Sequence, residues 1–102
     1  MVLTEDSVEQ SICRILEEHR EALRGHCVLL FGSRADGRAG HFSDFDLGVD
    51  GSEAMDLASF YELQDALEEI PTLYQLDWLD LNRASPKVSE NARRQGRVLY
   101  EG

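Results

Sequence analysis

The pattern of hydrophobic and polar positions along the chain predicts helices in three segments. Residues 6–24 and 56–70 each place apolar residues three or four positions apart, with charged residues between them, which is typical of amphipathic helices. Gly25 and Pro71 are expected to end these two helices. A shorter helix is expected over residues 85–96, because a Ser-Pro pair supplies an N-cap and a first-turn proline, and a glycine closes the segment.

Other segments have the apolar runs or the alternation of strands. Residues 27–31 form a short apolar run that suits a buried strand, and residues 73–81 and 98–100 predict two more. Residues 44–49 alternate strictly, so the apolar and the acidic side chains of this strand lie on opposite faces. We therefore expect one α/β (α+β) domain over residues 1–102, with a small mixed sheet of three to four strands flanked by helices.

The composition is that of an ordinary globular domain, with 102 residues, of which 42% are hydrophobic and 29% charged. No apolar run approaches the ~20 residues of a membrane span. The acidic N-terminus has no apolar signal core, which predicts a cytoplasmic protein without membrane contact. Cys13 and Cys27 lie among apolar neighbours and are expected to be reduced, buried and structural.

The charge distribution argues against a nucleic-acid binder. The net charge is −10, whereas duplex DNA binding requires a basic surface. Residues 50–80 contain nine acids and no Lys or Arg, and residues 83–97 contain five bases and one acid. The acidic stretch can be a solvated helix face or a docking surface for a basic partner.

Asp44 and Asp46 are the first candidates for chemistry. They are two positions apart on a predicted strand, so their side chains share a face, roughly 7 Å apart along the backbone. Mg²⁺ prefers carboxylate oxygens, water and substrate phosphates, and two such ions about 4 Å apart can stabilise the attacking and leaving oxygens of phosphoryl transfer. Acids on a sheet face are often merely solvated, but adjacent carboxylates repel and aspartate is a poor strand former. A bound cation would explain the pair.

A third carboxylate could come from the strand predicted over 73–81. Asp77 and Asp80 are the candidates, and strand alternation places them on opposite faces. The pattern alone does not separate them. Tyr74 and Trp78 in the same segment could stack on a base, but at strand spacing they are more typical of packing residues.

Gly32 and Ser33 follow the first predicted strand and begin a glycine-rich loop. Glycine allows close approach of the backbone to a ligand, so backbone N–H groups and the Ser33 hydroxyl could contact phosphate oxygens. Arg34 and Arg38 in the same loop could neutralise phosphates. A Gly-Ser pair alone is a weak signal, since most are ordinary turns.

In combination these segments are more specific than each alone. The Leu-Phe-Gly-Ser-Arg-Ala run at 30–35 and the Ser-Asp-Phe-Asp-Leu run at 43–47 resemble the minimal nucleotidyltransferase family, within the superfamily that includes DNA polymerase beta. The Leu-Asp-Trp-Leu-Asp-Leu run at 76–81 is similar to the third-aspartate strand of that family. The resemblance extends from about residue 8 to the C-terminus and implies the nucleotidyltransferase fold.

The resemblance also implies roles for the carboxylates. Asp44 and Asp46 match the two aspartates that bind both metal ions, which are expected to be Mg²⁺. Asp77 matches the third aspartate better than Asp80 does, and would help to bind the catalytic metal and activate the nucleophile. The implied chemistry is attack of a hydroxyl on the α-phosphate of ATP, with pyrophosphate as the leaving group.

For the phosphate loop, the resemblance implies that Gly32 and Ser33 contact the triphosphate, with Arg34 as a further nucleotide-binding residue. This chain departs from the family at Asp36, where a second loop arginine is common. The substitution removes a positive charge near the expected phosphates and makes triphosphate binding less certain.

Members of this family are typically encoded beside a HEPN-domain protein, as the antitoxin of a toxin–antitoxin pair, and transfer AMP to a tyrosine of the toxin. A protein adenylyltransferase with a HEPN-domain partner is therefore the expected function. One alternative is a non-catalytic antitoxin that neutralises its partner by occlusion. A small-molecule nucleotidyltransferase would need an acceptor-binding domain for which 102 residues leave no room, and template-directed polymerisation is disfavoured by the acidic charge.

Overall fold

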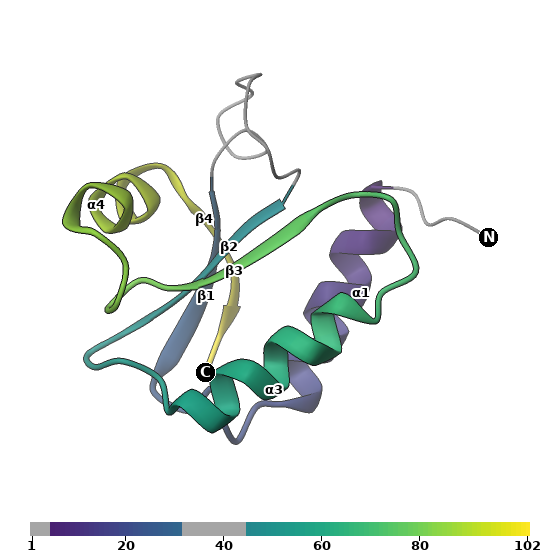
Figure 1. Cartoon of the computed structure of the whole chain (residues 1–102), viewed down its shortest axis with the longest axis horizontal. Coiled ribbons are helices and arrows are strands. Elements are labelled where there is room, and N and C mark those ends of the chain that lie inside the picture. Colours follow the sequence, from purple (N-terminus) through teal and green to yellow (C-terminus); the bar gives the residue numbers. More distant parts are fainter. Residues whose placement is uncertain (1–4, 32–44) are drawn as a thin grey trace.

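Four strands form a mixed sheet in the part of the chain that the structure, a computed structural model, describes, namely residues 5–31 and 45–102. The strand order is β3-β2-β1-β4 (Figure 1). β1 pairs antiparallel with both β2 and β4, and β2 pairs parallel with β3. This mixed sheet with its flanking helices confirms the predicted fold class. The elements in chain order are α1 (Glu5–Glu18), β1 (His26–Phe31), β2 (Phe45–Gly51), α3 (Leu57–Glu68), β3 (Leu76–Asp80), α4 (Pro86–Gln95) and β4 (Arg97–Glu101).

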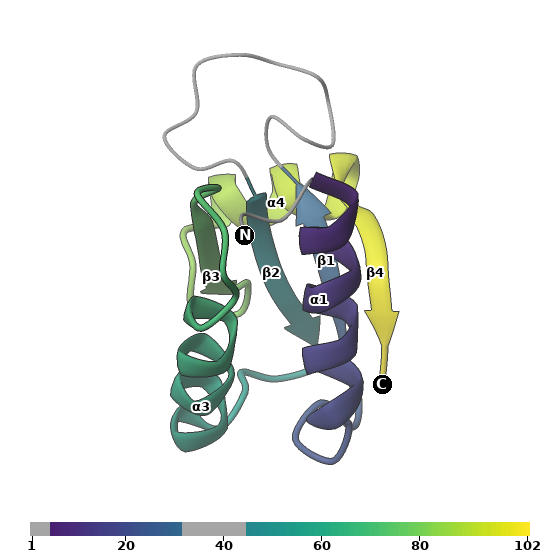
Figure 2. The same ribbon diagram turned by 90° about the vertical axis from the view of Figure 1, so that its right-hand side faces the viewer.

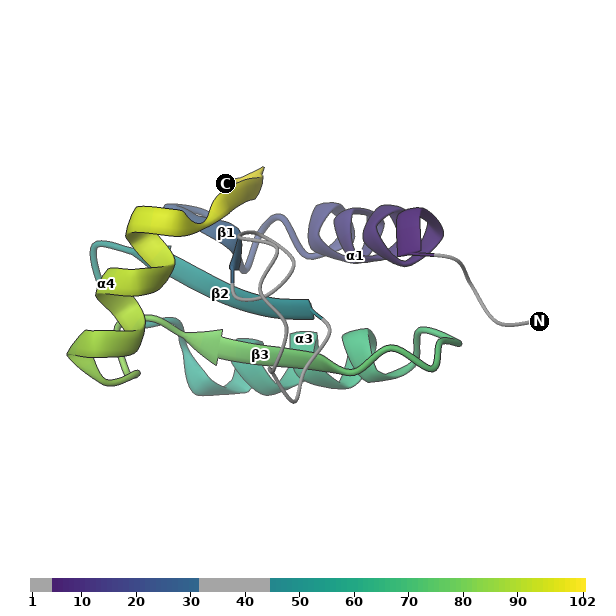
Figure 3. The ribbon, with the colours of Figure 1, turned by 90° about the horizontal axis from the view of Figure 1, so that it is seen from above.

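The helices lie in two layers on opposite sides of the sheet. Figure 2 shows α1 and α3 together in front of the sheet. Seen from above, α4 lies on one side of the strands and α1 and α3 on the other (Figure 3). One face of the sheet is thus covered by two helices, and the other face by α4.

The main core lies between the sheet and the helices α1 and α3. Phe45, Leu47 and Val49 of β2 point into it, as the strict alternation of this strand predicts. Trp78 of β3 stacks on Phe60 of α3, with ring centroids 5.6 Å apart, and its indole N–H donates to the Phe60 carbonyl oxygen at 3.0 Å. This confirms that Trp78 is a packing residue.

A smaller core joins α4 to the opposite face of the sheet. It contains Leu29 and Phe31 of β1, Leu81 after β3 and Ala92 of α4. Gly48 of β2 lies under this cluster, and a Cβ atom there would be 2.8 Å from Cδ2 of Leu81. The strand therefore requires glycine at this position because a larger side chain would overlap the core.

Two predicted boundaries were wrong. The first helix ends at Glu18 instead of residue 24, and the chain continues in turns to Gly25, whose φ of +80° reverses it into β1. The His19 ring lies 2.8 Å from the Ile15 carbonyl oxygen, which occupies an acceptor at the end of the helix. β3 begins at Leu76 instead of residue 73, because the exposed segment before it forms a turn in which Tyr74 N–H donates to the Thr72 hydroxyl.

The two cysteines are free, as expected, but half-buried and not fully buried as predicted. Their neighbours on the surface side are charged, so the apolar residues beside them in sequence were a poor guide to burial. Among the described residues no helix has the length and apolar character required to cross a membrane.

Candidate active site

Asp46 and Asp77 lie side by side on the sheet. In the parallel pairing of β2 with β3, Asp46 is in register with Asp77, and in the antiparallel pairing of β1 with β2 it is in register with Phe31. Register partners point to the same face. Since the neighbours of Asp46 in sequence face α1 and α3, these three residues form a row on the face that carries α4.

This row lies where β1 ends and where β2 and β3 begin, so it is at one end of these strands (Figure 1). Asp46 is 7% exposed, whereas the side chain of Asp77 on the edge strand is exposed. The two carboxylates therefore differ in environment: one is held within the sheet, and the other is accessible to a molecule that approaches the edge.

The structure separates Asp77 from Asp80, which the sequence pattern did not. Asp80 is in register with Val49, on the face of α1 and α3, and is 6% exposed. Its carboxylate accepts hydrogen bonds from the N–H of Met55 at 2.8 Å, the N–H of Asn82 at 2.9 Å and the Arg83 guanidinium at 3.2 Å. Asp80 thus ties the segment before α3 to the end of β3 and lies on the wrong face to join Asp46.

The remaining predicted site residues lie outside the described residues. These are Gly32, Ser33, Arg34 and Asp44. The first three follow Phe31 in the sequence, and Asp44 precedes Phe45, so they adjoin the two strand ends that carry the carboxylate row. Their roles stay predictions.

The donor set at the row has the chemistry that Mg²⁺ requires. Asp46 and Asp77 supply hard carboxylate oxygens from two adjacent strands, and Mg²⁺ is typically held by one or two carboxylates together with water and substrate phosphates. No group of three or more His, Cys, Asp or Glu residues able to hold a metal ion occurs within residues 5–31 and 45–102. The two described carboxylates fit a Mg²⁺ site that water and substrate phosphates complete.

Sequence reasoning missed a pocket of about 330 Å³ beside this row. It lies between Phe31 and one side of α4, where Lys87, Asn91 and Arg94 follow each other at helical spacing. Val88 and Glu90 complete its lining. The spacing of the three polar residues on a predicted helix was a signal that could have indicated a functional face.

Comparison with known protein families gives a match over most of the chain. The family described as "Polymerase beta, Nucleotidyltransferase" matches residues 10–102. The chain belongs to this nucleotidyltransferase family. The match includes the segments of both described carboxylates and of α4, so the row of Asp46 and Asp77 is part of the region that this family shares.

Individual relatives of this nucleotidyltransferase are similar over most of its length. "Probable protein adenylyltransferase MntA" of Haemophilus influenzae is 32% identical over 76 residues, which are 74% of this chain and 67% of the relative. A crystal structure of a toxin-antitoxin with AMP-PNP contains a chain that is 26% identical, with a TM-score of 0.63, over 92% of this chain and 73% of that one. A tri-AMPylated Shewanella oneidensis HEPN toxin in complex with MNT antitoxin gives a TM-score of 0.64 at 24% identity, over 97% of this chain and 74% of the other, and shares the fold.

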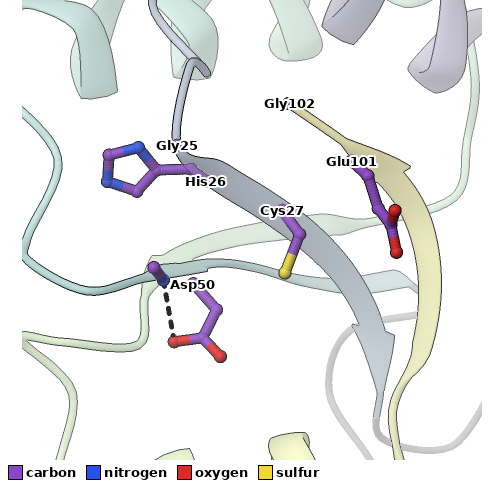
Figure 4. Close-up of a pocket in the computed structure, with 7 residues that line it drawn as sticks. Gly25, His26, Cys27, Asp50, Glu101 and Gly102 are labelled. Atoms are coloured by element: carbon purple, nitrogen blue, oxygen red, sulfur yellow. Dashed lines mark hydrogen bonds between the residues drawn. The ribbon is translucent and has the colours of Figure 1, made fainter.

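A second pocket of this nucleotidyltransferase, of about 350 Å³, is at the opposite end of β1 and contains a cysteine (Figure 4). Cys27 lies between Asp50 of β2 and Glu101 of β4, its register partners. Burial, and then the negative charges of Asp50 and Glu101, raise the pKa of the Cys27 thiol above its ordinary value of 9.0. The thiol is therefore protonated at neutral pH and is a poor nucleophile, and Arg93 already holds the Asp50 carboxylate at 2.8 Å.

Proposed function

We propose that this chain is a metal-dependent nucleotidyltransferase that transfers AMP from ATP to a hydroxyl group of a HEPN-domain partner protein, as the antitoxin of a toxin–antitoxin pair. The observation that carries the proposal is that Asp46 is in register with Asp77 at the start of their strands. Both residues lie within the range that matches the nucleotidyltransferase family. The relative named as a protein adenylyltransferase supports the reaction, and the similar structures with AMP-PNP and with an AMPylated HEPN toxin support the nucleotide and the partner.

Within this proposal, Asp44, Asp46 and Asp77 are the catalytic and metal-binding carboxylates. When bound, two Mg²⁺ ions would neutralise negative charge on the phosphates and on the leaving oxygen. Asp46 is suited to hold a fixed position, because it is buried between its register partners Phe31 and Asp77 at the start of β2, a strand that is paired on both sides. A carboxylate on a rigid strand needs little reorganisation during the reaction.

In the proposed reaction the acceptor oxygen attacks the α-phosphorus in line with the bridging oxygen. The new oxygen–phosphorus bond forms, the bond to the β-phosphate oxygen breaks, and pyrophosphate leaves with that electron pair. Asp77 is exposed on the edge strand, so an acceptor can reach it, and its carboxylate is proposed to take the hydroxyl proton. Gly32, Ser33 and Arg34 are proposed to hold the phosphate chain, so that positioning and charge stabilisation supply most of the catalysis.

Calorimetric titration with ATP and Mg²⁺ tests the site directly. The unaltered protein should bind ATP in a metal-dependent manner, and the Asp44→Asn/Asp46→Asn double variant should not. Asp50→Asn is the matched control, because Asp50 lies on the same strand but contacts Arg93 at the other end of the sheet. Loss of binding in the Asp50 variant, or equal binding by all three proteins, would contradict the proposed site.

Transfer is tested by incubating the protein with ATP, Mg²⁺ and a HEPN-domain protein as the proposed partner. The expected result is a mass increase of one or more AMP groups on the partner, absent with Asp77→Asn. We also propose that the protein acts in the cytoplasm and that residues 1–102 act as one domain.

A second candidate, neutralisation by contact alone, rests on the surface of α3. Leu57 and Tyr61 are 50% and 55% exposed, and Glu62, Asp65 and Glu68 on the same helix are exposed acids. Such a surface suits a basic partner with apolar side chains. Partner binding by a protein that does not bind ATP would favour this candidate over the transferase.

A further inference from the structure

The basic residues in and around α4 fall into two groups. Three of them hold carboxylates: Arg83 contacts Asp80 at 3.2 Å, Arg93 contacts Asp50 at 2.8 Å, and Arg97 contacts Glu9 at 2.6 Å. These ion pairs join α4 and the strands beside it to the rest of the fold.

Lys87 and Arg94 are the other group, and neither forms an ion pair with any residue in the described part of the chain. Both are exposed, and both line the pocket beside Phe31. Their positions, seven residues apart on α4, place them on the same side of the helix with Asn91 between them. Of the basic residues at 83–97, the two without an ion pair to the described residues thus line the same pocket.

This pocket adjoins the carboxylate row. Phe31 lines the pocket and is also the register partner of Asp46. α4 packs on the same sheet face that Asp46 and Asp77 share. A ligand held at the carboxylates would therefore have Lys87 and Arg94 on its α4 side.

We propose that Lys87 and Arg94 bind the β- and γ-phosphates of the nucleoside triphosphate. This inference rests on the proposed function, because it places the same substrate in the same site. Carboxylates alone repel a polyanionic substrate, and its phosphate chain needs cationic groups in addition to metal ions. Arginine can hold phosphate oxygens through two parallel N–H donors, and lysine binds them as a point charge.

The other lining residues agree with a nucleotide as the occupant. Phe31 and Val88 give the pocket an apolar wall, and the half-buried Asn91 amide offers both a donor and an acceptor. Glu90 is a single exposed acid against the two cations.

Titration calorimetry with ATP and Mg²⁺ on Lys87→Gln, Arg94→Gln and the double variant tests this. Each single change should weaken ATP binding about tenfold, the effect expected of one charge-assisted hydrogen bond at a partly exposed site. AMP has no β- or γ-phosphate, so its affinity should change less than twofold. Arg93→Gln is the matched control, because it removes the same charge from the same helix but from the residue that holds Asp50; its ATP affinity should be unchanged.

A second titration uses inorganic tripolyphosphate without metal and measures the cations alone. The unaltered protein should bind it, and the Lys87→Gln/Arg94→Gln protein should bind it at least tenfold more weakly, whereas the control Arg93→Gln should bind it as well as the unaltered protein. Melting curves for every variant check that the fold is retained.

The proposal is overturned if the double variant binds ATP and tripolyphosphate normally, or if Arg93→Gln loses as much affinity as Arg94→Gln, since that would indicate only a general charge effect. These outcomes differ from failure of the proposed function. If the unaltered protein binds ATP, and Asp46→Asn binds it more weakly while the Lys87 and Arg94 variants bind it normally, only the proposed phosphate role is wrong. If tripolyphosphate binding depends on Lys87 and Arg94 but no AMP transfer occurs, the proposed phosphate role stands and the proposed transferase activity is wrong.

Discussion

Replacing Asp80 should lower the free energy of unfolding far more than replacing Asp77, although the two residues are three positions apart on one strand. The perturbation is Asp80→Ala, which removes a carboxylate that is 6% exposed and accepts three hydrogen bonds. Asp77→Ala is the comparison, because it removes an exposed carboxylate from the same strand.

The size of the effect follows from the groups left behind. The N–H of Met55, a residue 1% exposed, would lose its acceptor, and an unsatisfied buried donor costs about 1–3 kcal/mol. The N–H of the exposed Asn82 can donate to water instead, so the loss of its hydrogen bond costs about 1 kcal/mol. Arg83 has a half-exposed side chain, so its ion pair adds less than about 1 kcal/mol. Together these predict a loss of about 3–4 kcal/mol, a large part of the 5–15 kcal/mol typical of a domain.

Urea unfolding followed by the fluorescence of Trp78, the only tryptophan in the sequence, is the assay, with circular dichroism as a second probe. With a slope of about 1.5 kcal/mol per M, the midpoint of Asp80→Ala should fall by about 2–3 M. Asp80→Asn keeps one oxygen acceptor and should lose about half as much. Asp77→Ala should lose less than about 1 kcal/mol but should abolish metal-dependent ATP binding.

The reverse result would refute the reasoning. If Asp80→Ala is as stable as the unaltered protein and no longer binds ATP, then Asp80 and not Asp77 is the third carboxylate, and the register argument fails. If both variants bind ATP normally, β3 supplies no site residue.

Three further predictions concern the scaffold. Gly48→Ala should destabilise the protein by about 1–3 kcal/mol in urea unfolding, because its Cβ would lie 2.8 Å from Leu81; a stability within 0.5 kcal/mol of the unaltered protein would contradict this. Asp56→Ala should cost about 1 kcal/mol in the same assay, because the Asp56 carboxylate caps α3 through the Ser59 N–H at 3.1 Å, and Asp56→Ser should recover most of it. The raised pKa of Cys27 means that the folded state holds the thiol proton more tightly than the unfolded chain does. Stability should therefore fall as the pH rises through 9 and above, and iodoacetamide should alkylate Cys27 more slowly than free cysteine at pH 8 to 9, in a Cys13→Ser background.

Local sequence patterns were sufficient for most elements because each has its own period and end signals. The alternation around Phe45 placed its apolar residues in the main core. The Ser85 cap and Gly96 bound α4 as expected. The patterns failed at two element ends where local hydrogen bonds replace the regular ones: at His19, whose ring contacts the Ile15 carbonyl oxygen, and before Leu76, where the Tyr74 N–H donates to the Thr72 hydroxyl.

The sequence by itself predicted which residues carry the proposed chemistry. A Gly-Ser pair after an apolar strand and an Asp-x-Asp on an alternating strand depend only on local order, and both lie within the family match over residues 10–102. Only the tertiary structure decided which partner each residue has. Asp77 joins Asp46 and Asp80 does not, because strand register sets which side chains share a face. Lys87 and Arg94 approach the same site because α4 packs on that face of the sheet, a relation between distant segments that no local pattern contains.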